Sequence, residues 1–493
     1  MKVFFDNKWA IPVSLAIIVL IGTVLRLQQL FTTDLWYDEA FTGITVRQTW
    51  SDMFDIIKQD RNHPPIYYCI VKLITDITSN TPTILRLFSF ISGIAAILMA
   101  YILAQQLTAF SAESKKKFGL FFAFILAVSP FYVTYSVEAR SYSFLLFLML
   151  CSFYLFLRTI RNPYKFTLDM GLLIISIIII IFTHYLSILV ISGYAVAYLL
   201  IYLQDTKKLD LPGFWRFATI ILLALFTLGV YLFSTTGLRE IFMQRNVGFI
   251  PESNLSMLPR VIASLLFGVD RQYLGVPPIN QFSFPLYTQN VAFVFLVAMI
   301  IVLVLTYQKT SLPEKKRELL VISAIGIVPL FLDILASSFG LFIYVDRYVI
   351  GYGTFFLFLA AYACWSIIDE KTSTIIPVYV LLLLFVALPQ RGKPFTNILN
   401  ALPSQSISSQ QIYIESAKDF LVLKYYMESA PLYVRHNPKT GFLNWPFIPP
   451  SVEKDLNMAK KGDYYIIRQG VGFNESGWET FKKSDGLIVL VKK

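Results

Sequence analysis

Long runs of apolar residues constrain this chain more than any other feature. About eleven are long enough, or nearly so, to cross roughly 30 Å of hydrocarbon as helices. Only 15% of the 493 residues are charged and 56% are hydrophobic, a balance that excludes a soluble globular protein. The sequence therefore predicts an all-α polytopic membrane domain. Its expected spans are 9–30, 85–107, 118–135, 142–157, 168–182, 185–203, 214–233, 291–307, 319–343, 348–368 and 374–388.

Lys and Arg residues give the expected orientation of these spans. They cluster in short segments such as Lys115–Lys117 and Lys315–Arg317, which the positive-inside rule assigns to the cytoplasm, together with the N-terminus. The long run from residue 168 to 203 has positive charge at both ends, so we divide it into two spans joined by an outer turn at Thr183-His184-Tyr185. Cell-membrane localisation follows, with residues 390–493 on the extracytoplasmic side.

Two adjacent carboxylates, Asp38 and Glu39, stand just after the first span. Acids close to hydrocarbon are costly and are usually retained for chemistry or ion handling, although a solvated loop start is the alternative. The loop that follows, about residues 31–83, is predicted to carry an amphipathic interfacial helix at 44–59. The next corner, His63-Pro64-Pro65, ends one helix and allows another to begin. His63 is either structural or part of a site.

Two further polar clusters fall at the outer ends of spans. One contains Glu138 and Arg140, which either pair with each other or face a ligand. The other is Arg347-Tyr348, at the start of a late span. Each Arg could instead extend to the interface, but several clusters on one face favour a common site. The loop 234–290, rich in proline, suits a lid or a substrate contact.

The composition changes near residue 390. We expect residues 1–389 to form the membrane domain and residues 390–493 a small soluble α/β domain. Its predicted strands are 411–414, 431–435, 463–468 and 486–491, with a helix at 417–428. The net charge of +11 does not imply nucleic-acid binding, because no basic, aromatic-rich patch lies on this domain. The three cysteines have no metal-ligand spacing.

Taken together, these motifs resemble the GT-C superfamily of integral-membrane glycosyltransferases, in the branch of the protein O-mannosyltransferases and the bacterial lipid A aminoarabinose transferase. The resemblance covers about residues 9–390. It differs from the protein mannosyltransferases after His63-Pro64-Pro65, where Ile66-Tyr67-Tyr68 replaces their usual Leu-Gly-Lys, so a protein acceptor is in doubt. The motifs are Asp38-Glu39, His63-Pro64-Pro65, Arg86-Leu87, Glu138-Ala139-Arg140, Thr183-His184-Tyr185 and Arg347-Tyr348.

The resemblance implies transfer of a sugar from a polyprenyl-phosphate carrier to an acceptor hydroxyl, with inversion. Asp38 would be the general base, and Glu39 would modulate it or bind the acceptor or a cation. Permanently charged arginines would stabilise the leaving phosphate. The acceptor would be a lipid, glycan or protein. The residues expected to bind substrate or lipid phosphate are His63, Arg86, Glu138, Arg140, His184, Arg347 and Tyr348.

No cofactor is required by this chemistry, and a divalent metal, if used, would bind Asp38 and Glu39. The competing hypothesis is a transporter or lipid flippase. Transporters usually place ionisable residues near the bilayer midplane; here Asp169 and Asp333 are the few acids near or inside spans, without an evident ionic partner in the sequence. A non-catalytic scaffold would leave the clusters of acids and arginines on one face unexplained.

Overall fold

The structure is a computed structural model. It describes residues 9–60, 63–161, 167–204, 313–338, 346–368, 394–402, 410–435, 453–468, 476–484 and 487–493, with isolated positions such as Leu265 between 205 and 312. Its backbone contacts divide the chain into two compact units. The first comprises Met1–Leu27 and Phe88–Pro389, and the second Gln28–Leu87 and Gln390–Lys493. The second unit thus combines two stretches that the sequence analysis places in different domains.

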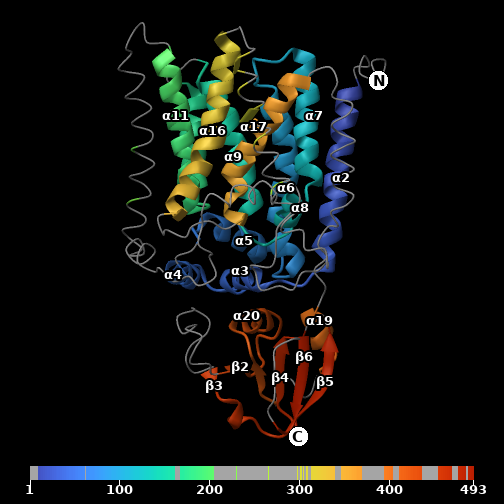
Figure 1. The fold of residues 1–493 in the computed structure, drawn as a ribbon. Helices are drawn as coiled ribbons and strands as arrows, with labels where there is room; N and C mark the ends of the chain where they lie inside the picture. Colours follow the sequence, from blue (N-terminus) through green and yellow to red (C-terminus); the bar gives the residue numbers. More distant parts are fainter. Residues whose placement is uncertain are drawn as a thin grey trace. The chain divides into compact units, whose positions relative to one another are not determined.

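The first unit is a bundle of apolar helices (Figure 1). Among the described residues six helices are long and apolar enough to span a membrane, or seven if the bent pair α7–α8 forms one span. The mostly helical membrane fold is confirmed, with predicted spans at or near these helices. They are α2 (Ala10–Thr32), α6 (Pro82–Ala104), α7 (Ala112–Val128), α8 (Pro130–Ser136), α9 (Tyr142–Thr159), α10 (Leu168–Ile181), α11 (Ile188–Gln204), α16 (Pro313–Ser338) and α17 (Ile350–Ile368), with short 3₁₀ turns η1 (Tyr185–Ser187) and η3 (Asp346–Val349).

The apolar run 168–203 does divide into two helices, α10 and α11, with His184 in the connection between them. Helix α10 has 14 residues and is shorter than the other spans. The predicted spans 214–233, 291–307 and 374–388, and the predicted loop 234–290, lie outside the described residues apart from isolated positions.

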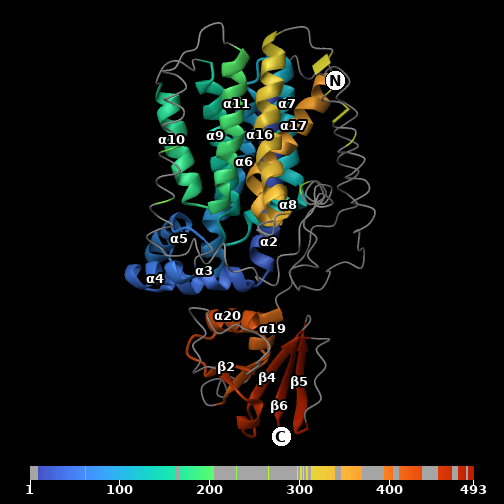
Figure 2. The ribbon, with the colours of Figure 1, turned by 60° about the vertical axis from the view of Figure 1, so that its left-hand side comes forward.

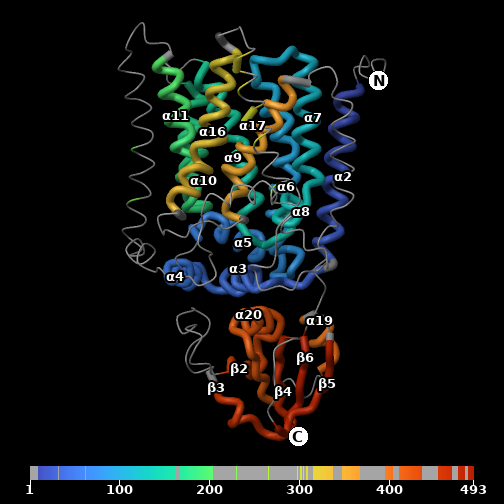
Figure 3. The backbone as a smooth tube through the Cα atoms, viewed as in Figure 1, coloured from blue at the N-terminus to red at the C-terminus, as the bar shows by residue number. Residues whose placement is uncertain are grey.

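The expected span 118–135 is broken rather than straight. Helices α7 and α8 meet at 63° around Ser129 and Pro130, and Figure 3 shows the path of the backbone through this region. Pro130 has no N–H to donate, so the carbonyl groups at the end of α7 need other donors. Arg26 of α2 supplies them: its Nη1 donates to Ala127 O and its Nη2 to Leu126 O, both at 2.9 Å.

Helix α8 packs closely against α6. A Cβ added at Gly93 would lie 2.3 Å from the hydroxyl of Ser136, so only glycine allows this approach. Around these contacts a continuous core of aromatic and aliphatic side chains runs through α6, α7, α9, α11, α16 and α17. The core fixes the helix ends on which several predicted site residues stand.

In the second unit, the stretch after α2 forms three helices, α3 (Tyr37–Arg47), α4 (Trp50–Asp60) and α5 (Ile66–Ile77). The prediction of one helix at 44–59 is wrong. The chain breaks between α3 and α4, where the Thr49 hydroxyl accepts from the Asp52 N–H and caps α4. Helix α3 begins early enough that Asp38 and Glu39 lie in its first turn rather than in a loop. The proline corner behaves as predicted, since α5 begins directly after Pro65.

The remainder of the second unit is a six-stranded sheet with order β3-β2-β1-β4-β6-β5 (Figure 2). Strands β3, β2, β1 and β4 are parallel, and β6 is antiparallel to β4 and β5. The elements are α19 (Pro394–Leu399), β1 (Ile412–Ile414), α20 (Ala417–Tyr426), β2 (Leu432–Arg435), β3 (Glu453–Lys454), η6 (Leu456–Met458), β4 (Tyr464–Arg468), β5 (Trp478–Ser484) and β6 (Leu487–Lys492).

The predicted α/β class of this region is confirmed, and four predicted strands and one helix coincide with β1, β2, β4, β6 and α20. Strands β3 and β5, the two edges of the sheet, were not predicted. Strand β3 has only two residues. Strand β5 contains lysines, and a bulge between Thr480 and Lys482 breaks its alternation of apolar and polar residues.

Candidate functional site

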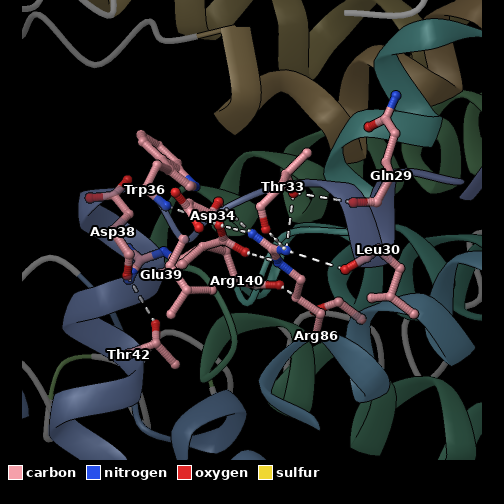
Figure 4. A network of polar contacts seen from close by, with 12 residues as sticks. Gln29, Leu30, Thr33, Asp34, Trp36, Asp38, Glu39, Thr42, Arg86 and Arg140 are labelled. Carbon is pink, nitrogen blue, oxygen red and sulfur yellow. Dashed lines mark hydrogen bonds and ion pairs between the residues drawn. The ribbon is translucent and has the colours of Figure 1, made fainter. Parts of the chain in front are cut away.

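The acidic turn of α3 is built around a buried ion pair (Figure 4). Arg86 Nε donates to Glu39 Oε1 and Arg86 Nη2 donates to Glu39 Oε2, each at 2.7 Å. Both residues are 0% exposed. A bidentate pair of this kind is both strong and directional, so it fixes the Glu39 side chain relative to the start of α6. Glu39 Oε2 also accepts from the Trp36 N–H at 3.2 Å, which caps α3.

The same guanidinium organises the chain between α2 and α3. Arg86 Nη1 donates to Thr33 O at 3.0 Å and Nη2 donates to Asp34 O at 2.9 Å. A third carbonyl, that of Leu30, lies 3.4 Å from Nη1. Arg86 therefore satisfies backbone groups of the turn that precedes the acids. Its planar, multiply bonding head suits this task better than a lysine would.

Asp38 precedes Glu39 on the same helical turn and is half-buried. Its backbone carbonyl accepts from the Thr42 hydroxyl at 3.2 Å. Because Arg86 compensates the charge of Glu39, the like-charge repulsion expected between the two acids is offset. Of the two carboxylates, Asp38 is the one that can accept a proton without breaking the buried ion pair.

His63 lies at the proline corner and is buried. Its Nδ1 is 3.7 Å from Asp60 Oδ2, at the end of α4. A carboxylate at this distance restrains the orientation of the imidazole. Asp60 was not singled out in the sequence, where its spacing of three residues from His63 was the available signal.

In the first unit, a tight turn carries Glu138 and Arg140, both buried. The Arg140 N–H donates to Glu138 O at 2.7 Å. The turn is held to α6 from both sides, because the Ser89 hydroxyl donates to Arg140 O at 2.9 Å and the Ser143 hydroxyl donates to Ser89 O at 2.8 Å. The backbone of Arg140 is thus fixed independently of its side chain.

Residues from three span ends meet at Tyr142, which begins α9 just after this turn. The ring centroids of His184 and Tyr348 are 4.9 Å apart, and those of His184 and Tyr142 are 6.4 Å apart. The Arg347 guanidinium lies 5.5 Å from the Tyr348 ring centroid. The structure therefore brings His184, Arg347 and Tyr348 together. A buried cation beside an imidazole and a phenol can bind an anionic oxygen by charge-assisted hydrogen bonds.

Two acids that bear on the transporter hypothesis have partners. Asp169 Oδ2 accepts from Arg158 Nε at 3.0 Å, where α9 ends and α10 begins. Asp333 is buried in α16, and its Oδ2 accepts from the Tyr352 hydroxyl at 2.8 Å. Neither partnership was readable in the sequence, because the residues stand on different helices.

Metal binding has limited support in the part of the chain that the structure describes. There, no three His, Cys, Asp or Glu side chains group as ligands for one ion. Arg86 engages both carboxylate oxygens of Glu39, so a cation bound by Glu39 would share these oxygens with the guanidinium.

Comparison with known proteins gives one family match. Residues 62–231 match the family described as dolichyl-phosphate-mannose-protein mannosyltransferase. That stretch contains His63, Arg86, Arg140 and His184. No curated protein sequence matches this chain.

Similar solved structures include ArnT from Cupriavidus metallidurans bound to undecaprenyl phosphate, with 12% identity, a TM-score of 0.46, and coverage of 96% of this chain and 97% of ArnT. The Archaeoglobus fulgidus oligosaccharyltransferase in the apo form has 13% identity and a TM-score of 0.46, over 86% of this chain and 64% of the enzyme. AglB from the same archaeon, in complex with an inhibitory peptide and a dolichol-phosphate, has 12% identity and a TM-score of 0.46, over 87% and 64%. The family resemblance predicted from the motifs is confirmed over residues 62–231.

Proposed function

We propose that this protein is a membrane glycosyltransferase that moves a sugar from a polyprenyl-phosphate carrier to an acceptor hydroxyl, with inversion, on the extracytoplasmic face. The observation that carries the proposal is the family match over residues 62–231, which contains most of the polar motifs. The gathering of His184, Arg347 and Tyr348 at the ends of three spans supports it. A carrier embedded in the bilayer needs its phosphate recognised at span ends.

Asp38 is the proposed general base. In a single displacement it accepts the proton of the acceptor hydroxyl while the acceptor oxygen bonds to the anomeric carbon. The bond from that carbon to the phosphate oxygen breaks on the opposite side, which inverts the configuration. Glu39 and Arg86 hold the turn that carries Asp38, because their carboxylate and guanidinium are engaged with each other.

Arg347, His184 and Tyr348 are proposed to bind the leaving phosphate. Charge grows on the phosphate as the glycosidic bond breaks, and a buried guanidinium stabilises that charge more than water does. Arg140 and Glu138 are assigned to the same substrate, with Arg140 as a further phosphate contact. His63 is assigned to the acceptor side, on the helix corner that follows α4. The partners are a polyprenyl-phosphate sugar, membrane lipids and a lipid, glycan or protein acceptor.

The donor is tested first. Purified protein in nanodiscs should transfer sugar from a polyprenyl-phosphate sugar and should not turn over with a nucleotide sugar alone.

The side of the membrane is tested by labelling single cysteines from outside the cell, in a variant without the three native cysteines. Ser429→Cys should be modified and Ala112→Cys should be spared. The reverse labelling pattern would remove the extracytoplasmic site.

The base and the phosphate site are separated by two substitutions. Asp38→Asn should lower the single-turnover rate by about 10²- to 10⁴-fold and leave carrier binding intact. The exposed Asp55→Asn, on α4, makes the same chemical change and should be active. Arg347→Ala should weaken binding of the polyprenyl phosphate product, and Arg347→Lys should weaken it less. If Asp38→Asn turns over normally, Asp38 is not the base.

A further inference from the structure

Helix α20 of the C-terminal region packs against α3, the helix that carries Asp38. The two lie side by side in Figures 1 and 2, both within the second unit. Arg47, in the last turn of α3, donates from Nη1 to Tyr425 O at 2.9 Å, and its guanidinium lies 4.2 Å from the Tyr425 ring centroid. The Tyr425 hydroxyl donates to Asn80 O at 2.7 Å, just before α6.

The next residue reaches the other end of α3. The Tyr426 hydroxyl accepts from the Leu35 N–H at 3.1 Å, three residues before Asp38. The adjacent Asp34 is bound by the same region, because its Oδ2 accepts from the backbone N–H groups of Phe395 at 2.9 Å and Thr396 at 3.0 Å, at the start of α19. Two consecutive residues at the entrance to α3 are therefore held by residues 395–426.

The middle of α3 leaves no room for adjustment. A Cβ added at Gly43 would lie 2.5 Å from Cε2 and 2.8 Å from Cδ2 of the Tyr425 ring. Contacts this close require glycine, so the ring of Tyr425 rests on the backbone of α3 itself. At the start of α20, the Lys418 Nζ lies 4.9 Å from the centroid of Tyr37, the neighbour of Asp38.

We infer that one end of α20 positions the proposed base: Tyr425 and Tyr426 are positioning residues that fix α3 and thereby the direction in which Asp38 points. The inference rests on the proposed role of Asp38. It follows from the contacts above, which fix the entrance, the middle and the last turn of α3 from a single helix end. A displacement of the base by about 1 Å is enough to lower the rate by roughly two orders of magnitude.

Two variants test the inference from opposite sides of the contact, each in the full-length protein in nanodiscs. Tyr426→Phe removes the acceptor of the Leu35 N–H. Gly43→Ala adds the methyl group that the Tyr425 ring excludes. Tyr413→Phe is the matched control, because the Tyr413 hydroxyl donates to Gln411 within the sheet region. The measurements are hydrogen exchange of the amides of residues 35–47, and kcat and KM with a polyprenyl-phosphate sugar.

For Tyr426→Phe we expect exchange over residues 35–47 to be roughly fivefold faster, the worth of one hydrogen bond. The kcat should fall about tenfold to a hundredfold with an unchanged KM for the donor. Gly43→Ala should have the same two effects, although alanine favours an isolated helix and would by itself slow exchange. Adding Tyr425→Leu to Gly43→Ala should partly restore both the slow exchange and the kcat, because it removes the ring that meets the methyl group. Tyr413→Phe should change neither quantity.

Unchanged exchange in both variants, or faster exchange with an unchanged kcat, would overturn the inference. A fall in kcat accompanied by an equal rise in donor KM would also overturn it, because that result indicates general damage to substrate binding. If the wild-type protein transfers no sugar from any lipid-linked donor, the proposed function fails. The exchange data then still decide whether α20 holds α3.

Discussion

The ion pair between Glu39 and Arg86 allows a prediction whose size can be worked out from its geometry. Both side chains are 0% exposed, so the energetics of a buried pair apply rather than those of a surface pair. Removing one partner of a buried pair costs about 3–5 kcal/mol, because it leaves an uncompensated charge. The two single substitutions should lower the free energy of unfolding by different amounts within that range, because the side chain that remains keeps different hydrogen-bond partners in each case.

After Glu39→Gln, the guanidinium of Arg86 keeps the carbonyl groups of Thr33 and Asp34 as acceptors. This loss should lie near the lower end, about 3 kcal/mol. After Arg86→Met, the carboxylate of Glu39 still accepts from the Trp36 N–H at 3.2 Å, but it has lost both bonds from the guanidinium. This loss should lie near the upper end, about 5 kcal/mol. The double variant Glu39→Leu/Arg86→Met leaves no buried charge and should lose less than the sum of the single changes.

The assay is reversible unfolding in mixed detergent micelles, read out as the free energy of unfolding for the wild type, both single variants and the double variant. Lys117→Met is the control, because it breaks a surface pair with Glu113 and should change stability by less than about 1 kcal/mol. Two results would show that the pair does not organise this turn. One is equal losses of unfolding free energy in the single variants that simply add in the double variant. The other is losses as small as that of the control.

Three further predictions follow from contacts described above. Arg26→Met removes the donors to the carbonyl groups at the end of α7, including Ala127, and should cost about 1–3 kcal/mol per buried acceptor left unpaired, measured by the same unfolding assay. Burial raises the pKa of Tyr425 to about 12 from an ordinary value of 10. The neutral phenol therefore contributes to the free energy of unfolding in full below pH 10, and this contribution is lost as the pH rises towards 12. Thermal melts should show that loss in the wild type and a smaller one in Tyr425→Phe. Asp333→Asn keeps an acceptor for the Tyr352 hydroxyl and should retain sugar transfer; abolished function with intact folding would favour an ion-coupled transporter.

The apolar runs allowed much of the membrane fold to be predicted, because a bilayer leaves the backbone few alternatives to a helix. Local signals also located the proline corner before α5 and most strands of the C-terminal sheet. The start of α3 was missed, since its cap is the side chain of Glu39 rather than a Ser, Thr, Asp or Asn before the helix. The break before α4 was readable in principle from Thr49 and Asp52, which stand three residues apart as in a capping motif.

The partners of the site residues were less predictable. Arg86 was assigned to lipid phosphate, and no periodicity connects it with Glu39, 47 positions earlier. Tyr426 and Leu35 are 391 positions apart, and nothing in the local sequence distinguishes Tyr426 from the other 27 tyrosines of the chain. By contrast, membrane topology alone predicts that the connections carrying His184 and Tyr348 lie on one face, and the structure places their ring centroids 4.9 Å apart.

The second unit consists of two distant stretches, Gln28–Leu87 and Gln390–Lys493, and this affects how the chain folds during synthesis. The ribosome completes the first of these stretches about 300 residues before it reaches the second. At the usual elongation rates of about 5–20 residues per second, that interval is roughly 15–60 s. During it, Asp34, Leu35 and Arg47 have no α19 or α20 to bind, although Glu39 and Arg86 are both already present. A chain that stalls or is cleaved before its end would lack these contacts to α3 and the turn before it. If those contacts position Asp38, as inferred above, such a chain would be inactive.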